Sequence, residues 1–67
     1  MEAYQTRMIN EFNELEERAS KLNQFIESNE MFKTLDQEKQ NLMKLQLEGM
    51  RVYEYALNKR IELENIQ

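Results

Sequence analysis

The sequence predicts an all-α protein: an antiparallel two-helix hairpin that assembles into a helical homo-oligomer. The chain has 67 residues, with no proline, one glycine and 33% charged residues, a composition rich in good helix formers. Its apolar residues recur with the period of a helix and not with the alternation of a strand. A chain this short buries only about 60% of its unfolded surface. Since it has no cysteine or histidine for a disulfide or zinc site, we expect it to gain stability by self-association.

The first helix is expected over about residues 2–28. Its apolar side chains are spaced 4, 3, 4, 3 and 4 residues apart, which predicts a heptad seam along one face. A turn follows at about residues 29–33, where Asn29 can adopt the left-handed conformation that ends a helix. Thr34 and Gln37 fit a capping box, so the second helix is expected over about residues 35–65. The seam of the first helix consists of Met8, Phe12, Leu15, Ala19, Leu22 and Ile26.

A short connector folds the second helix back along the first. With the turn centred near residues 30 and 31, residues whose numbers sum to about 61 should face each other. This register places Tyr4 beside residues 57–60 and Arg7 beside residues 53–57. We therefore expect these four segments to meet at the open end of the hairpin.

The second helix carries more apolar surface than one neighbouring helix covers. A stripe that includes Met50 and Leu57 is expected to face the first helix. Further apolar residues lie on the far side, and burying such a side chain is worth roughly 1.5–3 kcal/mol. We therefore expect another copy to cover them, although scattered apolar side chains are also common on protein surfaces. The expected oligomer interface consists of Leu45, Val52, Ala56 and Leu63.

Gly49 lies within the second predicted helix. A glycine in a helix costs close to 1 kcal/mol relative to alanine. Close approach of another helix or of a ligand would compensate for this cost, and we favour helix packing over a ligand.

Aromatic and basic residues gather at the expected open end, and Tyr4, Arg7, Tyr53 and Arg60 are the candidate ligand-binding residues. Arginine forks match phosphate oxygens and tyrosine rings can stack on a base, so two or more copies would line a shared pocket that could hold a nucleotide. In the alternative interpretation, the tyrosines cap the core and the arginines form ordinary i, i+4 ion pairs. Those pairs would be Arg7–Glu11, Arg18–Glu14 and Arg60–Glu64.

Composition argues against several classes of function. A net charge of −4, from 13 acids and 9 bases, disfavours a nucleic acid polymer as partner because phosphate neutralisation relies on Lys and Arg. No apolar run approaches 18 residues, and an acid stands near the N-terminus where a secretion signal carries positive charge. We therefore expect no membrane partner and a cytoplasmic location, with which the absence of cysteine agrees.

The residue types also disfavour catalysis. Histidine and cysteine are absent, and no serine stands in a glycine-flanked nucleophile turn. Glu14, Glu16 and Glu17, or Glu62 and Glu64, offer carboxylates, but they lack the spacing of a calcium loop. We expect no enzyme activity, no cofactor and no metal site.

A set of positions along nearly the whole chain carries a resemblance to a known group of proteins. The first part of the set is Arg7, Glu11, Leu15, Arg18, Leu22, Phe25, Ile26, Ser28, Phe32, Leu35, Glu38 and Leu42. The second part is Gln46, Leu47, Met50, Tyr53, Leu57, Arg60 and Ile61. This pattern resembles the small helical-hairpin proteins of tailed phages and prophages, including crAss-like phages.

The resemblance implies a phage accessory gene expressed in a bacterial cytoplasm. Phage hairpins of similar architecture sequester nucleotide signals of host immunity, such as the cyclic oligonucleotides of CBASS or the ADP-ribose derivatives of Thoeris. The first hypothesis is thus a non-enzymatic counter-defence protein that binds itself and a cyclic oligonucleotide or ADP-ribose-type molecule. The second is an inhibitor or adaptor that docks an apolar helix face on a host protein. The third is a small structural or scaffold protein.

Overall fold

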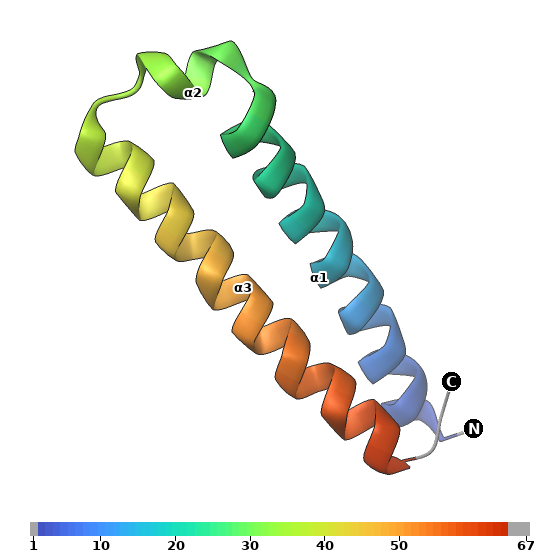
Figure 1. The fold of residues 1–67 in the computed structure, drawn as a ribbon. Helices are drawn as coiled ribbons and strands as arrows, with labels where there is room; N and C mark the ends of the chain where they lie inside the picture. Colours follow the sequence, from blue (N-terminus) through green and yellow to red (C-terminus); the bar gives the residue numbers. More distant parts are fainter. Residues whose placement is uncertain (1, 65–67) are drawn as a thin grey trace.

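A computed structural model describes residues 2–64 and contains three helices. They are α1 (Ala3–Ser28), α2 (Glu30–Thr34) and α3 (Gln37–Glu64). Figure 1 shows that α1 and α3 lie side by side and run in opposite directions, with α2 across one end. The molecule is a rod of 46 × 15 × 14 Å. The predicted all-α class is confirmed, and position 65, where the second helix was expected to end, lies outside the described residues.

The core is the contact between the predicted seam of α1 and one stripe of α3. Met8 of α1 packs in a buried cluster with Leu57 and Ile61 of α3. Leu57 is 1% exposed, and Ala19 is fully buried, so its small side chain allows the two helices to approach closely. Burial of each large apolar side chain contributes roughly 1.5–3 kcal/mol. A single line of residues therefore holds the hairpin together.

The connector differs from the expected simple turn. Asn29 has φ −89° and ψ 126°, an extended conformation, so the predicted left-handed ending of the first helix is wrong. Its side chain instead accepts a hydrogen bond from the Met31 N–H at 2.8 Å and begins α2. Asparagine suits both roles, because the same short side chain tolerates the left-handed conformation and caps helix N-termini.

The start of the long second helix is also shifted. The Thr34 hydroxyl donates to the Met31 carbonyl at 2.7 Å, so the predicted capping box at Thr34 does not form. Asp36 is the cap: its Oδ1 accepts from the Lys39 N–H at 2.9 Å, and its carbonyl accepts from the Gln40 N–H at 3.1 Å. Helix α3 therefore begins at Gln37, because the carboxylate of Asp36 satisfies an otherwise unpaired backbone donor.

This longer connector changes the register of the hairpin. The Tyr4 hydroxyl donates to Glu64 Oε1 at 2.7 Å, and Arg51 Nη1 lies 3.5 Å from Glu16 Oε2. Facing residues therefore have numbers that sum to about 68, and the predicted sum of about 61 is wrong by two helical turns. The error arises because α2 and residues 35–36 move the midpoint of the connector to about residue 34.

Two phenylalanines close the core beside the connector. The rings of Phe25 and Phe32 meet edge to face, with centroids 6.2 Å apart and an interplanar angle of 87°. Phe32 is buried, and Lys44 Nζ lies 5.9 Å from its ring centroid. The short helix α2 is thus attached to the body of the hairpin by an aromatic pair of favourable geometry.

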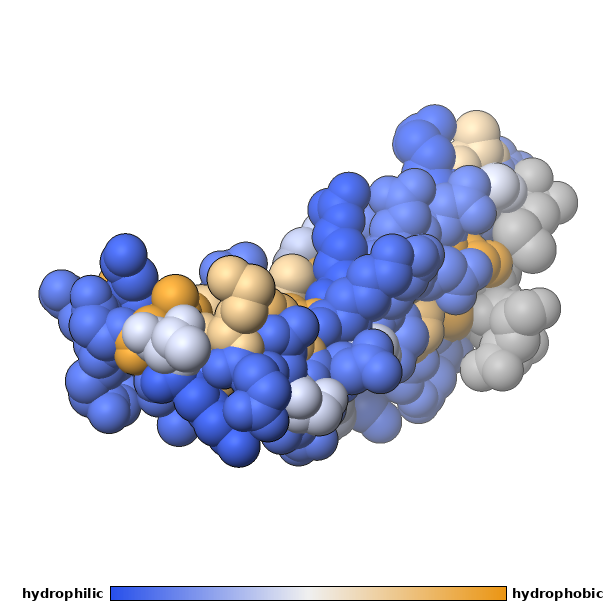
Figure 2. Space-filling model, turned by 90° about the horizontal axis from the view of Figure 1, so that it is seen from above, coloured by the Kyte–Doolittle hydropathy of each residue, from blue (hydrophilic) through white to orange (hydrophobic). Residues whose placement is uncertain are grey.

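A second set of apolar side chains lies outside this core. Among the candidate interface residues, Leu45, Val52 and Leu63 are 61%, 65% and 88% exposed, and Ala56 is also exposed. In the face shown in Figure 2, hydrophobic side chains reach the surface between hydrophilic ones. The predicted excess of apolar surface on the second helix is therefore present in the single chain.

We expect the two methionines Met8 and Met31 to respond very differently to truncation. Met8 is 4% exposed and Met31 is 65% exposed. Because a buried Met→Ala change leaves a cavity, Met8→Ala should lower the free energy of unfolding by about 2–5 kcal/mol. Met31→Ala should change it by less than about 0.5 kcal/mol. Urea unfolding at one protein concentration measures both, and equal losses would contradict the described core.

The capping geometry predicts the order of two further variants. Asp36→Ala removes the N-cap of α3 and should cost about 0.5–2 kcal/mol. Thr34→Ala removes only an exposed hydroxyl that donates to a carbonyl, so its cost should be smaller. Thermal unfolding followed by circular dichroism compares the two variants. A larger loss of stability in Thr34→Ala than in Asp36→Ala would contradict Asp36 as the cap and support the capping box expected at Thr34.

Candidate functional site

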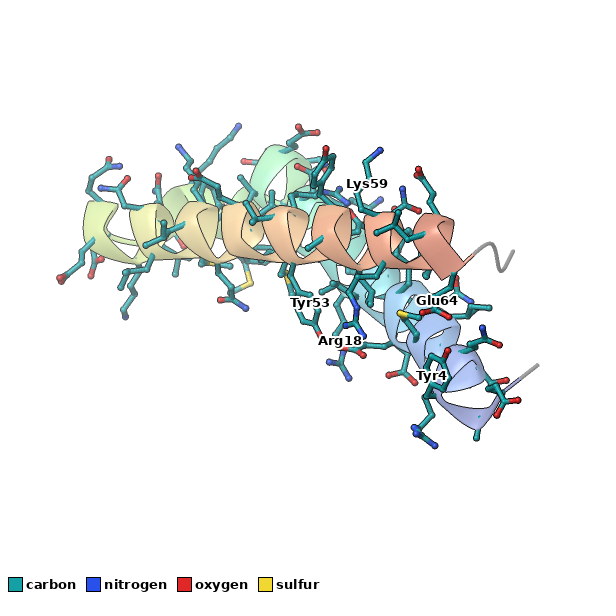
Figure 3. The ribbon with its side chains drawn as sticks, turned by 90° about the horizontal axis from the view of Figure 1, so that it is seen from below. Tyr4, Arg18, Tyr53, Lys59 and Glu64 are labelled. Atoms are coloured by element: carbon teal, nitrogen blue, oxygen red, sulfur yellow. The ribbon has the colours of Figure 1, made fainter. Side chains whose placement is uncertain are left out.

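Five exposed basic and aromatic residues lie along one side of the α1–α3 contact, and we call them the arginine–tyrosine face. At 3.6 residues per turn, Arg7 and Arg18 of α1 point within about 20° of each other, as do Tyr53 and Arg60 of α3. Figure 3 shows Tyr4, Arg18 and Tyr53 on one side of α3 and Lys59 on the other. The face consists of Tyr4, Arg7, Arg18, Tyr53 and Arg60.

The observed register spreads the predicted residues along this face. Tyr4 contacts Glu64 at the open end, whereas Tyr53 lies opposite residue 15, about 16 Å further along the axis. The predicted placement of Arg7 beside Tyr53 is therefore wrong. Arg7 lies level with Arg60 instead, because their numbers sum to 67. The face is thus a strip along the hairpin and not a cluster at its open end.

Arg18 joins this strip and was not among the predicted ligand-binding residues. Its side chain projects to the same side as Tyr53. Sequence analysis placed it in an ion pair with Glu14, so its position on the face was overlooked. The sequence spacing could have predicted this position, because Arg7 and Arg18 are 11 residues apart, which is close to three full turns of a helix.

The arginines of the face have no carboxylate partners within residues 2–64. The three expected pairs, Arg7–Glu11, Arg18–Glu14 and Arg60–Glu64, are absent, and the ion pairs that form there involve other residues. Glu64 accepts hydrogen bonds from Tyr4 and Gln5 instead. Three of the four arginines of the chain thus present exposed guanidinium groups, which bind phosphate oxygens through paired N–H donors.

The hydrogen bond between Tyr4 and Glu64 fixes one end of the face. It raises the pKa of the Tyr4 hydroxyl above its ordinary value, because the bond to the Glu64 carboxylate favours the protonated phenol. The same bond, with a second from Gln5, lowers the pKa of Glu64. Tyr4 is therefore a neutral hydrogen-bond donor at physiological pH, and the residue is 46% exposed.

A pocket of about 310 Å³ lies on the opposite side of the α1–α3 contact, and we call it the Glu54 pocket. The side chain of Glu54 is 12% exposed, and its Oε1 accepts from Arg51 at 2.9 Å. Its Oε2 is buried and has no hydrogen-bond partner among the described residues. The pocket is lined by Phe12, Arg51, Glu54, Tyr55 and Asn58.

The chemistry of the Glu54 pocket differs from that of the arginine–tyrosine face. Arg51 is shared between Glu16 and Glu54, so its charge is already neutralised and a phosphate gains little there. The unpartnered oxygen of Glu54 would accept a hydroxyl or amine donor, since a buried acceptor without a partner costs free energy. Sequence analysis missed this pocket, although Glu54 stands at a heptad core position between Met50 and Leu57.

Other classes of site find no support in the described part of the chain. Within residues 2–64, no three His, Cys, Asp or Glu side chains are grouped so that they hold a metal ion. None of the described helices combines the length and the apolar character needed to span a lipid bilayer.

Comparison with known protein families identifies a match over most of the chain. The model of a family described as Sequestin matches residues 2–63, nearly the full length of the chain. The chain belongs to the sequestin family. Comparisons with curated proteins and with solved structures found no match.

The family name is informative about the kind of function. It is compatible with a protein that sequesters another molecule, and it suggests a binding protein and not an enzyme. The arginine–tyrosine face of this sequestin agrees with that description, because it offers hydrogen-bond donors and aromatic rings.

The Tyr4–Glu64 bond predicts how the open end of this sequestin responds to pH. The lowered pKa of Glu64 means that its stabilising contribution is lost as pH falls through that pKa. Because the pKa of Tyr4 is raised, the stability that its protonated hydroxyl contributes to the fold is lost as pH rises through that pKa. The bond should therefore persist between about pH 4.3 and 10, the ordinary values of the two groups. In an NMR titration, Tyr4→Phe should raise the Glu64 midpoint, and an unchanged midpoint would contradict the contact.

Proposed function

We propose that this sequestin is a non-enzymatic phage counter-defence protein that binds and sequesters a phosphate-bearing nucleotide immune signal on its arginine–tyrosine face. The observation that carries the proposal is the set of three unpaired, exposed arginines in a chain with 13 acids. In so acidic a chain, nearby carboxylates are plentiful, yet these three guanidinium groups contact none of those in residues 2–64. They are available to an anion that comes from outside the chain.

The arrangement of the face suits a nucleotide better than a simple anion. Arg7 and Arg60 lie at the same level, one on each helix, so both can approach one phosphate group from opposite sides. Arg18 and Tyr53 lie further along and supply a second cation beside an aromatic ring. A tyrosine ring stacks on a base, so a ligand with phosphates and bases would engage both parts of the strip.

The chemistry of the face also fits binding without turnover. Arginine stays protonated in proteins and cannot act as a general base, and Tyr4 is held protonated by Glu64. A signal bound here is withheld from its receptor and not destroyed. In this proposal the protein acts in the cytoplasm of an infected bacterium, and its ligands are cyclic oligonucleotides or ADP-ribose derivatives.

A second function is favoured by the exposed apolar residues of α3. Leu45, Val52 and Leu63 would allow the helix to dock in a groove of a host protein as an inhibitor or adaptor. The two functions differ in their dependence on arginine. Docking through α3 requires these apolar residues, whereas nucleotide binding requires the guanidinium groups.

Nucleotide binding is tested with matched charge variants. Purified protein is mixed with cyclic di-AMP, cyclic tri-AMP and ADP-ribose, with inorganic phosphate as a comparison, and thermal unfolding is followed. A bound nucleotide at 100 times its Kd should stabilise the protein by about 2.7 kcal/mol. Arg18→Gln should weaken binding roughly 10- to 100-fold, since a hydrogen bond to a charged group is worth about 1.5–3 kcal/mol.

Lys39→Gln is the control for that experiment. It removes the same charge from an exposed residue at the start of α3, far from the face, and should leave nucleotide binding unchanged. Stabilisation by no member of the panel would reject the proposed function. An equal loss in Arg18→Gln and Lys39→Gln would reject the assignment to the face, because binding would then depend on net charge alone.

A further inference from the structure

Helix α3 carries a second heptad seam, which we call the outer seam. Its positions are spaced 3, 4, 3, 4 and 7 residues apart, the pattern of a helix that packs against a partner along its length. Its four large side chains are 58–88% exposed in the single chain. The seam spans about 32 Å of helix. It consists of Leu42, Leu45, Gly49, Val52, Ala56 and Leu63.

Two small residues leave room on the outer seam. A Cβ added to Gly49 would meet no atom within 4 Å, so nothing within the chain compensates for a glycine in the middle of a helix. Ala56 lies seven residues later, two turns along the same seam. Close approach of a neighbouring helix is the usual reason for a small residue at such a position, and here that neighbour belongs to another molecule.

The chain exposes more surface than a compact monomer of its mass, and the excess is about the area that one partner buries in a dimer interface. It exposes 5218 Å², whereas a compact monomer of 8.2 kDa exposes about 4500 Å². The excess of about 700 Å² is close to the roughly 800 Å² that each partner contributes to a standard protein interface. The isolated hairpin therefore has about as much surplus surface as one such interface buries.

We propose that the outer seam pairs with the outer seam of a second copy of the chain, in antiparallel orientation. In a parallel pair, like positions meet, so Gly49 would face Gly49 and Ala56 would face Ala56, which leaves two gaps. In an antiparallel pair whose facing residues have numbers that sum to 101, Gly49 faces Val52 of the second copy and Ala56 faces Leu45. Small side chains then meet large ones, and the surface is complementary to itself, as a two-fold interface requires.

This pairing also completes the nucleotide site, a step that rests on the function proposed above. Tyr53 and Arg60 lie about 40–60° round α3 from the centre of the outer seam, so they border the interface. An antiparallel second copy brings its own Tyr53 and Arg60 to the same edge. The two arginine–tyrosine faces then form one continuous surface around the two-fold axis.

Self-association is tested with two matched variants in analytical ultracentrifugation. Val52 and Met31 are both 65% exposed, so aspartate at either position leaves the core of the hairpin intact. The natural chain and Met31→Asp should sediment as dimers, and Val52→Asp should sediment as a folded monomer with its dimer dissociation constant raised at least 100-fold. A monomeric natural chain, or a dimer unaffected by Val52→Asp, would overturn the proposal.

Orientation is tested by cross-linking, for which the absence of natural cysteine provides a clean background. In the antiparallel pair, the two copies of Val52→Cys lie near the axis, and a short bis-maleimide should join them. The two copies of Leu63→Cys lie about 37 Å apart along the helix axis and should remain unjoined. Equal cross-linking of both variants would show a parallel pair and overturn the antiparallel assignment.

The monomeric variant Val52→Asp also tests whether nucleotide binding requires the dimer. Val52→Asp alters no residue of the arginine–tyrosine face, yet it should bind cyclic di-AMP and ADP-ribose at least tenfold more weakly than Met31→Asp if the site spans two copies. Equal binding by both variants would show that one copy suffices. A dimer that binds no nucleotide would leave the antiparallel pairing in place and reject the proposed function.

Discussion

The structure depends on the packing of one heptad seam of α1 against one stripe of α3. Met8, Leu57 and Ile61 form the buried centre of this contact, and the faces of α1 and α3 that it buries determine which side chains stay exposed. The contact covers only one of the two apolar stripes of α3, because a single neighbouring helix reaches only one side. It also leaves two flanks, one with arginines that form no ion pair within residues 2–64 and one with the Glu54 pocket. A small core thus determines which surfaces are available for binding.

The two flanks show how similar residue types acquire different chemistry. Arg51 is held between Glu16 and Glu54, so it serves the structure of its flank. Arg7 and Arg18 lie on the other flank and form no ion pair within residues 2–64, where Glu64 accepts hydrogen bonds from Tyr4 and Gln5. Although the chain has a net charge of −4, it therefore presents a local set of cations that have no carboxylate partner among residues 2–64. The proposed sequestration of a nucleotide depends on this distribution of charge and not on the net charge.

The sequence predicted the helices and the core seam because apolar periodicity is a strong and local signal. The register between the two long helices was predicted wrongly, because it depends on the length and shape of the connector. There, Asn29 can end one helix or begin the next, and only the whole structure decides between them. The predicted ion pairs of Arg7, Arg18 and Arg60 are absent for another reason. Each exposed pair stabilises a helix by only a few tenths of a kcal/mol, which is too little for sequence spacing alone to fix a side-chain conformation. Glu54 was predictable, since a carboxylate at a core position needs a partner.

The central claim is that copies of this sequestin join to hold a phosphate-bearing nucleotide. Native mass spectrometry of protein purified from cells in which the signal is produced tests it most directly, followed by identification of any released compound. The account predicts a species of two 8.2 kDa chains with the added mass of a nucleotide that carries phosphate. A single 8.2 kDa chain with no bound compound would contradict it.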